Sequence, residues 1–284
     1  MGTIIKYQLK ESKNRALFIL GLLAVFHVIA WFFELREIML GTYTFTASVK
    51  FWIFLSMSVT FIMLIIQFFR CASGHTDQLL YRDTSYLMLT VPRHGWEILG
   101  GRFIAGLIEF VIYLAGAGVL LLVHAATIFT LARSGAVVFF DVLEYGLKHI
   151  FVDNFVFSLQ MLLIMLCMYS VTGICLTFAF VASRSFIKRK SIATIVSVLG
   201  FIFITNWTLY FGNVLSERYN WYAKMTLTID TLPYTGMHSL DRIANSNLIV
   251  QDMFFPVAPL VFFIILGAGL FAAASWLMEK KVEV

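Results

Sequence analysis

The sequence contains few charged residues: Asp, Glu, Lys and Arg together make up 13% of its 284 residues. Charged residues make up about 25% of an average soluble domain, so this chain has too few to cover the water-facing surface of a soluble protein of its size. Proline, with four residues, and glycine, with 18, are outnumbered by 29 phenylalanines. Disordered and collagen-like chains have the opposite composition, and both classes are excluded.

Cysteine and catalytic motifs are also scarce. The three cysteines, Cys71, Cys167 and Cys175, have neither the number nor the spacing of a disulfide framework or a zinc site. The chain contains no phosphate-binding Gly-x-x-x-x-Gly-Lys-Ser/Thr loop, no His-Glu-x-x-His metal motif and no Gly-x-Ser-x-Gly nucleophile motif. We therefore expect no catalytic residue, no metal ligand and no cofactor on this chain.

Hydrophobic residues are abundant instead, at 60% of the sequence. A helix needs about 20 apolar residues to cross the hydrocarbon core of a bilayer. The sequence predicts an all-α polytopic membrane protein, with a single transmembrane domain over residues 1–284. Six stretches are long and apolar enough to span the membrane, at residues 16–33, 51–69, 103–132, 155–182, 192–211 and 253–278.

Lys and Arg are unequally divided between the two sides of the predicted membrane. The termini and the segments that follow the second and fourth spans hold 14 of these residues, and the remaining segments hold 7. Basic residues are retained on the cytoplasmic side. We therefore predict a multi-pass protein with both termini in the cytoplasm. The basic excess needs no nucleic-acid partner to explain it.

Three segments outside the spans have sequence patterns that predict their structure or location. Residues 1–15 place Ile5 and Leu9 opposite lysines, which predicts a short helix along the cytoplasmic interface, in contact with membrane lipid. Residues 138–151 carry apolar side chains at helical spacing and predict a helix on the outer membrane surface. Residues 212–252 form a long, aromatic-rich extracellular loop, which either caps a pathway or is an anchored surface loop.

Between the second and third spans, residues 76–90 predict a further helix. Thr76 or Asp77 provides an N-cap, and Pro92 ends the helix because a residue before proline disfavours helical geometry. Leucine and tyrosine exposed at the cytoplasmic face are unfavourable unless they lie on lipid or in a groove of a partner. The candidate partner-facing residues are Leu79, Leu80, Tyr81, Arg82, Asp83, Tyr86 and Leu87.

Residues 83–102, which begin within this predicted helix, resemble a segment of a known family. Their sequence is Asp83-Thr-Ser-Tyr-Leu-Met-Leu-Thr-Val-Pro-Arg-His-Gly-Trp-Glu-Ile-Leu-Gly-Gly-Arg102. It is similar to the segment after the second span in permease subunits of type-2 ATP-binding-cassette exporters. There, a Leu-rich, Pro-containing stretch leads into an Ile/Leu-Gly-Lys/Arg entry to the third span, and Arg102 stands where Lys is common. The six spans, the N-terminal interfacial helix and the long outer loop are similar too.

This resemblance implies that residues 76–90 form a coupling helix, seated in a groove of a separate nucleotide-binding ATPase subunit. ATP and Mg²⁺ would then be bound by that partner. The resemblance also implies a second permease subunit, identical or homologous, and a place in the bacterial plasma membrane. The expected function is ATP-driven export of a hydrophobic or amphiphilic cargo, with a peptide, toxin or antibiotic favoured.

Glu109 is the only formally charged residue within the six predicted spans. It follows Arg102 by seven residues and so lies about 10 Å further along the helix. A charge near the centre of a span costs about 3 kcal/mol, so we expect Glu109 to be protonated, paired or in contact with water. Two interpretations are open: a polar element of the transport pathway, or a hydrogen bond between helices.

Two other classes of function stay open. A secondary transporter usually has paired repeats and broken helices, and neither is evident here. An intramembrane hydrolase is less favoured because the spans contain no pair of aspartates. The remaining polar side chains of the spans are expected to form hydrogen bonds between helices. These are His27, Gln67, His124, Gln160 and Asn206.

Overall fold

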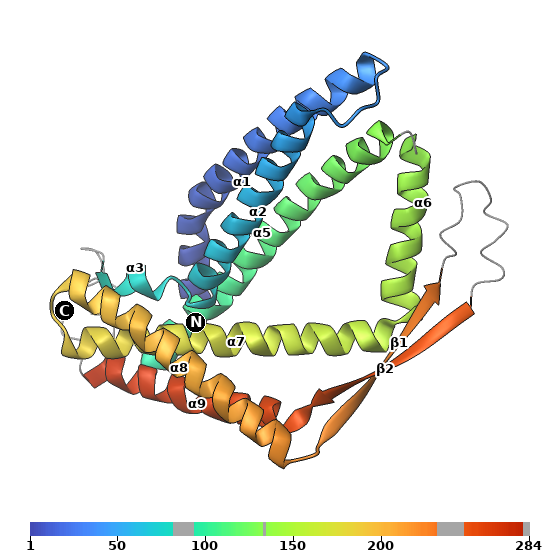
Figure 1. Ribbon diagram of the computed structural model, residues 1–284. Helices are drawn as coiled ribbons and strands as arrows, with labels where there is room; N and C mark the ends of the chain where they lie inside the picture. The colour runs from blue at the N-terminus through green and yellow to red at the C-terminus, as the bar shows by residue number, and fades with distance from the viewer. Residues whose placement is uncertain (82–93, 133–134, 232–246, 281–284) are drawn as a thin grey trace.

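The computed structural model describes residues 1–81, 94–132, 135–231 and 247–280 (Figure 1). Six of its helices are long and apolar enough to cross a membrane. Large apolar side chains lie exposed along these helices, as expected for surfaces that face lipid. The chain is therefore an all-α polytopic membrane protein. The six helices are α1 (Gly2–Met39), α2 (Ala47–Ala72), α5 (Gly95–Leu131), α7 (Phe155–Phe186), α8 (Lys190–Arg218) and α9 (Val257–Lys280).

The helices are longer than the apolar stretches that predict them. With 38 residues, α1 is about 57 Å long, whereas the hydrocarbon core is about 30 Å thick. It runs without a break from Gly2, so residues 1–15 continue into the first span instead of forming a separate interfacial helix. The reason is tertiary packing: Gln8 and Ser12, on the inner side of this segment, are buried.

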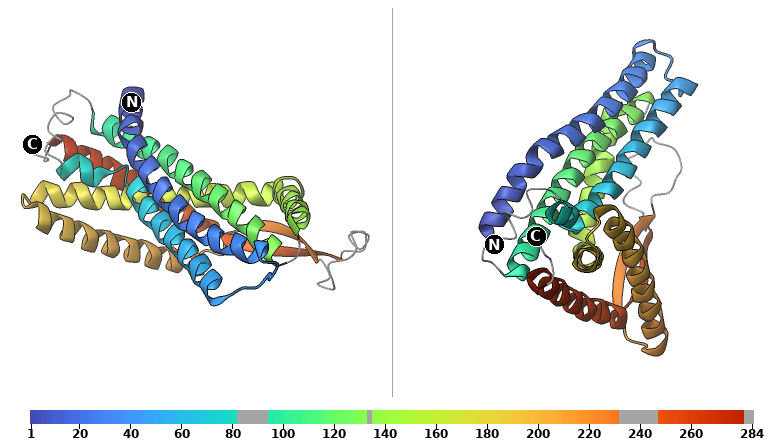
Figure 2. Two further views of the ribbon diagram at one scale, coloured as in Figure 1. Left: turned by 90° about the horizontal axis from the view of Figure 1, so that it is seen from above. Right: turned by 90° about the vertical axis from the view of Figure 1, so that its left-hand side faces the viewer.

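The six helices form two groups of three. One group consists of α1, α2 and α5, and the other of α7, α8 and α9 (Figures 1 and 2). Both termini lie at the end where the groups meet, and the groups diverge toward the opposite end. We call these the terminal end and the far end. At the far end, α6 (Gly135–Lys148) and the π-helix η1 (His149–Asp153) connect α5 to α7.

The two groups meet at the last turn of α2. A Cβ atom added to Gly106 of α5 would lie 2.0 Å from the carbonyl oxygen of Cys71. A Cβ atom added to Gly173 of α7 would lie 2.2 Å from the carbonyl oxygen of Ala72. Such close approach of helix backbones requires glycine. The end of α2 is thus held between one helix of each group.

A two-stranded antiparallel ribbon occupies much of the segment predicted as a long loop. Strand β1 (Tyr222–Thr231) pairs with β2 (Asn247–Pro256) along its whole length. Asn154, just before α7, anchors the ribbon, because its side chain donates to the carbonyl oxygen of Thr228 and accepts from the Thr228 amide. The predicted loop is therefore wrong for these residues, and the sixth membrane helix begins at Val257 rather than at residue 253.

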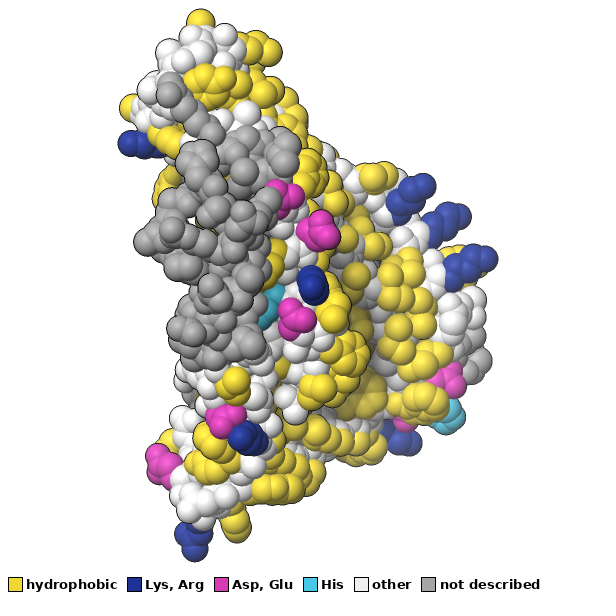
Figure 3. Space-filling model, turned by 90° about the vertical axis from the view of Figure 1, so that its right-hand side faces the viewer, with side chains coloured by type: hydrophobic (Ala, Val, Ile, Leu, Met, Phe, Trp, Pro, Cys, Tyr) yellow, Lys and Arg dark blue, Asp and Glu magenta, His cyan; other side chains and the backbone are white. Residues whose placement is uncertain are grey.

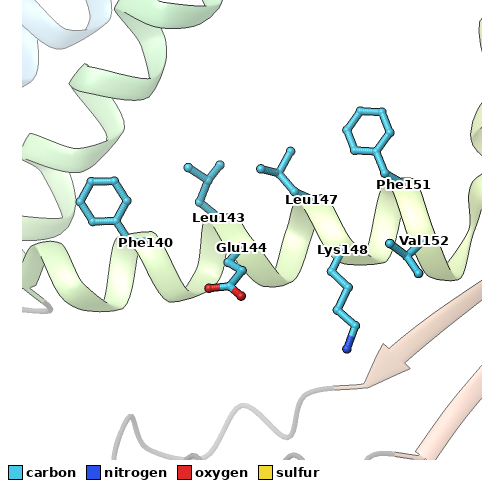
Figure 4. A pocket seen from close by; sticks show the side chains of 7 residues that line it. All are labelled: Phe140, Leu143, Glu144, Leu147, Lys148, Phe151 and Val152. Atoms are coloured by element: carbon cyan, nitrogen blue, oxygen red, sulfur yellow. The ribbon is translucent and has the colours of Figure 1, made fainter.

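The helix predicted over residues 138–151 is confirmed as α6 and η1. Apolar side chains are spread over the face that carries it, with single acidic and basic side chains among them (Figure 3). In Figure 4, Phe140, Leu143 and Leu147 project to one side of the helix, and Glu144 and Lys148 project to the other. This amphipathic pattern suits a helix on a membrane surface, and that location stays a prediction.

Candidate functional site

The turn between α2 and α3 (Thr76–Tyr81) has an unusual backbone. Gly74 has φ +58° and His75 has φ +54°, a left-handed conformation that non-glycine residues rarely adopt. Arg102 of α5 holds the turn in place. Its Nε donates to the carbonyl oxygen of Gly74 and its Nη2 to that of His75, both at 3.0 Å. Strain of this kind persists where surrounding contacts determine the conformation.

This turn directs the His75 side chain between α1 and α5. Its Nε2 lies 2.9 Å from Glu109 Oε2 and 3.0 Å from Arg15 Nη2. Arg15 Nη2 also donates to both Glu109 oxygens, at 3.0 and 3.2 Å, and the Tyr113 hydroxyl donates to Oε1 at 3.2 Å. Glu109 is therefore paired, one of the three states expected from the sequence. We call Arg15, His75, Glu109 and Tyr113 the Glu109 network.

Burial determines the electrostatics of this network. The side chains of His75 and Glu109 are each 1% exposed, whereas that of Arg15 is 20% exposed. Burial lowers the pKa of His75, and the Glu109 carboxylate only partly offsets this. The imidazole is therefore neutral at neutral pH. Arg15, which stays charged in proteins, supplies the positive charge that balances Glu109.

Three potential metal ligands meet in the same place. Donor atoms of Cys71, His75 and Glu109 lie within 4.8 Å of one another, the one such group of three found in the described part of the chain. The Arg15 guanidinium already contacts two of these donors. A permanent cation in that position competes with a metal ion, so the residues fit an ion-pair network better than a metal centre.

The network extends into α3, where the predicted coupling helix begins. Arg15 Nη1 donates to Gln78 Oε1 at 3.1 Å, so α1, α3 and α5 are joined through polar side chains. On the other side of α3, Leu79 and Leu80 are only 3% and 5% exposed. They belong to an apolar core, with α5, α7 and α9, that also contains Ile98, Leu99, Leu176, Phe180, Val181, Ala274, Leu277 and Met278.

The structure thus corrects part of the predicted partner-facing set. Leu79 and Leu80 are buried within the chain itself and do not present their side chains to a partner. Their apolar character is explained by this core, because α3 fills the junction between the two groups of helices. Tyr81 is the last residue of α3. The other four members, Arg82, Asp83, Tyr86 and Leu87, lie outside the described residues.

A second buried polar cluster contains Glu34, which the sequence analysis does not single out. Glu34 falls just beyond the predicted first span, yet it lies within α1 and is fully buried. His27 and His124 are fully buried beside it. A signal was present, because His27, Ala30 and Glu34 repeat at helical spacing and so share one face of α1.

Comparisons with known proteins do not assign the chain. No protein-family model, no curated protein and no solved structure matches it. The similarity of residues 83–102 to exporter permeases therefore rests on the sequence features given above. Together with the position of α3 and the Glu109 network, those features are the basis for inferring a function.

Proposed function

We propose that this chain is a permease subunit of an ATP-driven exporter, coupled through residues 76–90 to a separate nucleotide-binding ATPase subunit. The position of α3 carries the proposal. Through Leu79 and Leu80, this helix contributes to a core shared with α5 of one group and with α7 and α9 of the other. A partner that moves this segment would act on both groups of membrane helices at once.

Polar contacts would transmit such a movement from α3 to the membrane helices. Gln78 of α3 is bonded to Arg15 of α1, and His75 contacts Glu109 of α5. On the side of the second group, the Thr177 hydroxyl of α7 donates to the carbonyl oxygen of Ser73 at 3.3 Å. The turn before α3 is thus bonded to helices of both groups. In this proposal Glu109 links helices, and its burial favours that role over one in the pathway.

The remaining parts of the proposal follow the same reasoning. Both termini and α3 share the terminal end, which we assign to the cytoplasm of a bacterial plasma membrane, because the basic residues concentrate there. A second permease subunit completes the translocation path for a hydrophobic or amphiphilic cargo, with a peptide, toxin or antibiotic favoured. The abundance of exposed apolar side chains on the membrane helices is compatible with such a cargo.

The test is whether ATP hydrolysis copurifies with the chain. We expect the tagged full-length protein, extracted in mild detergent from cells that make it naturally, to carry an ATPase activity. Tyr86→Ala with Leu87→Ala should weaken binding of the ATPase about thirtyfold and so lower the copurified activity, because loss of a buried apolar anchor costs at least about 2 kcal/mol of affinity. Leu79 and Leu80 are unsuitable for this test because their replacement would open the core.

The matched control is Phe140→Ala with Leu147→Ala, which removes an equally apolar pair at the far end. Both residues occupy exposed positions of α6. This control should retain the full ATPase activity. Absence of ATP hydrolysis from the wild-type preparation would favour a secondary transporter. Normal activity and normal transport in the Tyr86 and Leu87 variant would remove the coupling role from this segment.

A further inference from the structure

The buried cluster near the far end of α1 lies apart from the Glu109 network. His27 and Glu34 come from α1, Thr60 from α2, and His124 and Thr127 from α5. His27, Glu34 and His124 are each 0% exposed, inside a group of helices whose outer surfaces are apolar. Three ionisable side chains thus share a space closed to water, between helices that span the membrane.

Half of the polar side-chain atoms of this cluster lack a hydrogen-bond partner. His27 Nε2 contacts the Thr60 hydroxyl at 2.9 Å, but His27 Nδ1 and both ring nitrogens of His124 have no partner. Glu34 Oε1 lies 3.3 Å from His124 Nε2, without the alignment of a hydrogen bond. Buried polar groups are normally paired, so four unpaired donors and acceptors in one cluster call for a structural or functional reason.

The Thr127 hydroxyl is the one hydrogen-bond partner of Glu34 among the described residues. It is 2.8 Å from the carbonyl oxygen of His124 and also within hydrogen-bond distance of Glu34 Oε2. The other carboxyl oxygen, Glu34 Oε1, has no hydrogen-bond partner. A charged carboxylate in the interior needs several donors or a cation, so this single donor favours the neutral form of Glu34.

The surrounding charges lead to the same state. The ionisable groups that face Glu34 are His27 on α1 and His124 on α5, and α2 contributes only the uncharged Thr60. No lysine or arginine of the described ranges pairs with Glu34; Arg36, close by on α1, pairs with Glu37 at 2.7 Å. Without a permanent cation beside it, a buried carboxyl group is favoured in its neutral form.

We propose that Glu34 and His124 form a proton-binding site that links α1 to α5 at the far end. In its buried position the carboxyl group of Glu34 holds the proton more strongly than an exposed glutamate does. On release, its O–H bond breaks, the proton passes to His124 Nε2, 3.3 Å from Glu34 Oε1, and a carboxylate stays on Glu34. Glu34 is five residues from the end of α1 at Met39, about 8 Å, so the far end is the nearer one for exchange of this proton with the medium.

The consequence is a contact between α1 and α5 that depends on pH. When Glu34 loses its proton, a charge appears in a space closed to water, and packing of the two helices is weakened. This property does not depend on an ATPase partner. It would exist in a secondary transporter as well, so its test is separate from that of the proposed function.

The first measurement is thermal stability of the purified full-length chain from about pH 6 to about pH 9. The folded chain keeps a proton that the unfolded chain releases, so stability should fall as the pH rises. We expect the wild-type melting temperature to fall by about 4 °C per pH unit while the folded chain still holds the Glu34 proton, and to level off once Glu34 deprotonates. Glu34→Gln, which resembles the neutral acid, should remove this dependence. Glu37→Gln, which changes a neighbouring carboxyl group paired with Arg36, should retain it.

The second measurement is infrared spectroscopy at neutral pH, which detects the carbonyl band of a protonated carboxyl group. We expect this band in the wild type and in Glu37→Gln, and not in Glu34→Gln. Glu34→Met, which also lacks the carboxyl group, provides a second variant should the first fail to fold. A wild type without the band, or a band and a pH slope that survive replacement of Glu34, would overturn the proposal.

Discussion

At the scale of single residues, the central feature is a carboxylate that one cation and one neutral imidazole share. Arg15 and Glu109 are 94 positions apart in the sequence and join α1 to α5. An isolated charge in the interior is strongly disfavoured, so each member of the pair depends on the other. Because Arg15 is partly exposed, solvent screens its charge and moderates the energy of the pair.

We predict that Glu109→Gln lowers the free energy of unfolding by about 2 kcal/mol or more, because Arg15 loses its counter-charge. Arg15→Gln combined with Glu109→Gln should cost less than the sum of the single changes, by about 1 kcal/mol or more. Denaturant titration of the purified chain measures both effects. Glu217→Gln, at an exposed carboxyl group on α8, is the matched control and should change stability little. Strictly additive single effects would show that Arg15 and Glu109 are not coupled.

The sequence indicated the presence of Glu109 in a span but not its partners. Its position among apolar residues was enough to predict that it must be protonated, paired or hydrated. The pairing depends on His75, which reaches Glu109 only because residues 74 and 75 adopt left-handed conformations and Arg102 holds them. No local periodicity encodes such a contact between distant segments, so the sequence alone does not predict that His75 contacts Glu109.

At the scale of elements, the end of α2 is the point where helix backbones come closest. We predict that Gly173→Ala destabilises the protein by about 2 kcal/mol, because the added methyl group would overlap the carbonyl group of Ala72. Gly118→Ala is the control: nothing lies within 4 Å of its Cβ position, so it should be neutral or stabilise α5 by up to about 1 kcal/mol. Melting temperatures of the two variants give the comparison. Equal values would mean that α7 moves away from α2 without cost.

The helices were predictable from the sequence and the ribbon was not recognised, although it carries a signal. Over β1, the apolar residues Ala223, Met225 and Leu227 alternate with polar residues, which is the two-residue period of a strand. The predicted loop rests on the length and aromatic content of this segment and not on its alternation. Helix ends were missed for another reason: α1 and α8 continue beyond their apolar stretches, where tertiary packing rather than hydropathy decides.

At the scale of the whole molecule, the orientation in the membrane can be measured directly. In a Cys167→Ala background, which removes the least buried native thiol, we predict that Lys148→Cys and Lys224→Cys react with a membrane-impermeant maleimide applied to intact cells. Lys188→Cys, between α7 and α8 at the terminal end, should react only after permeabilisation. The reason is the concentration of basic residues at the terminal end. Labelling of Lys188→Cys from outside would invert the assigned topology.

The glycine contacts at the end of α2 also provide a pivot about which α5 and α7 can rotate. From Gly106, α5 extends 25 residues to Leu131, about 38 Å, and from Gly173, α7 extends back 18 residues to Phe155, about 27 Å. A rotation of α5 by about 10° about this pivot would carry its far tip by about 7 Å and its terminal end at Gly95 by only about 3 Å. A small displacement of α3, which leaves the apolar core around Leu79 and Leu80 intact, would therefore separate the helices by a larger distance at the opposite membrane surface.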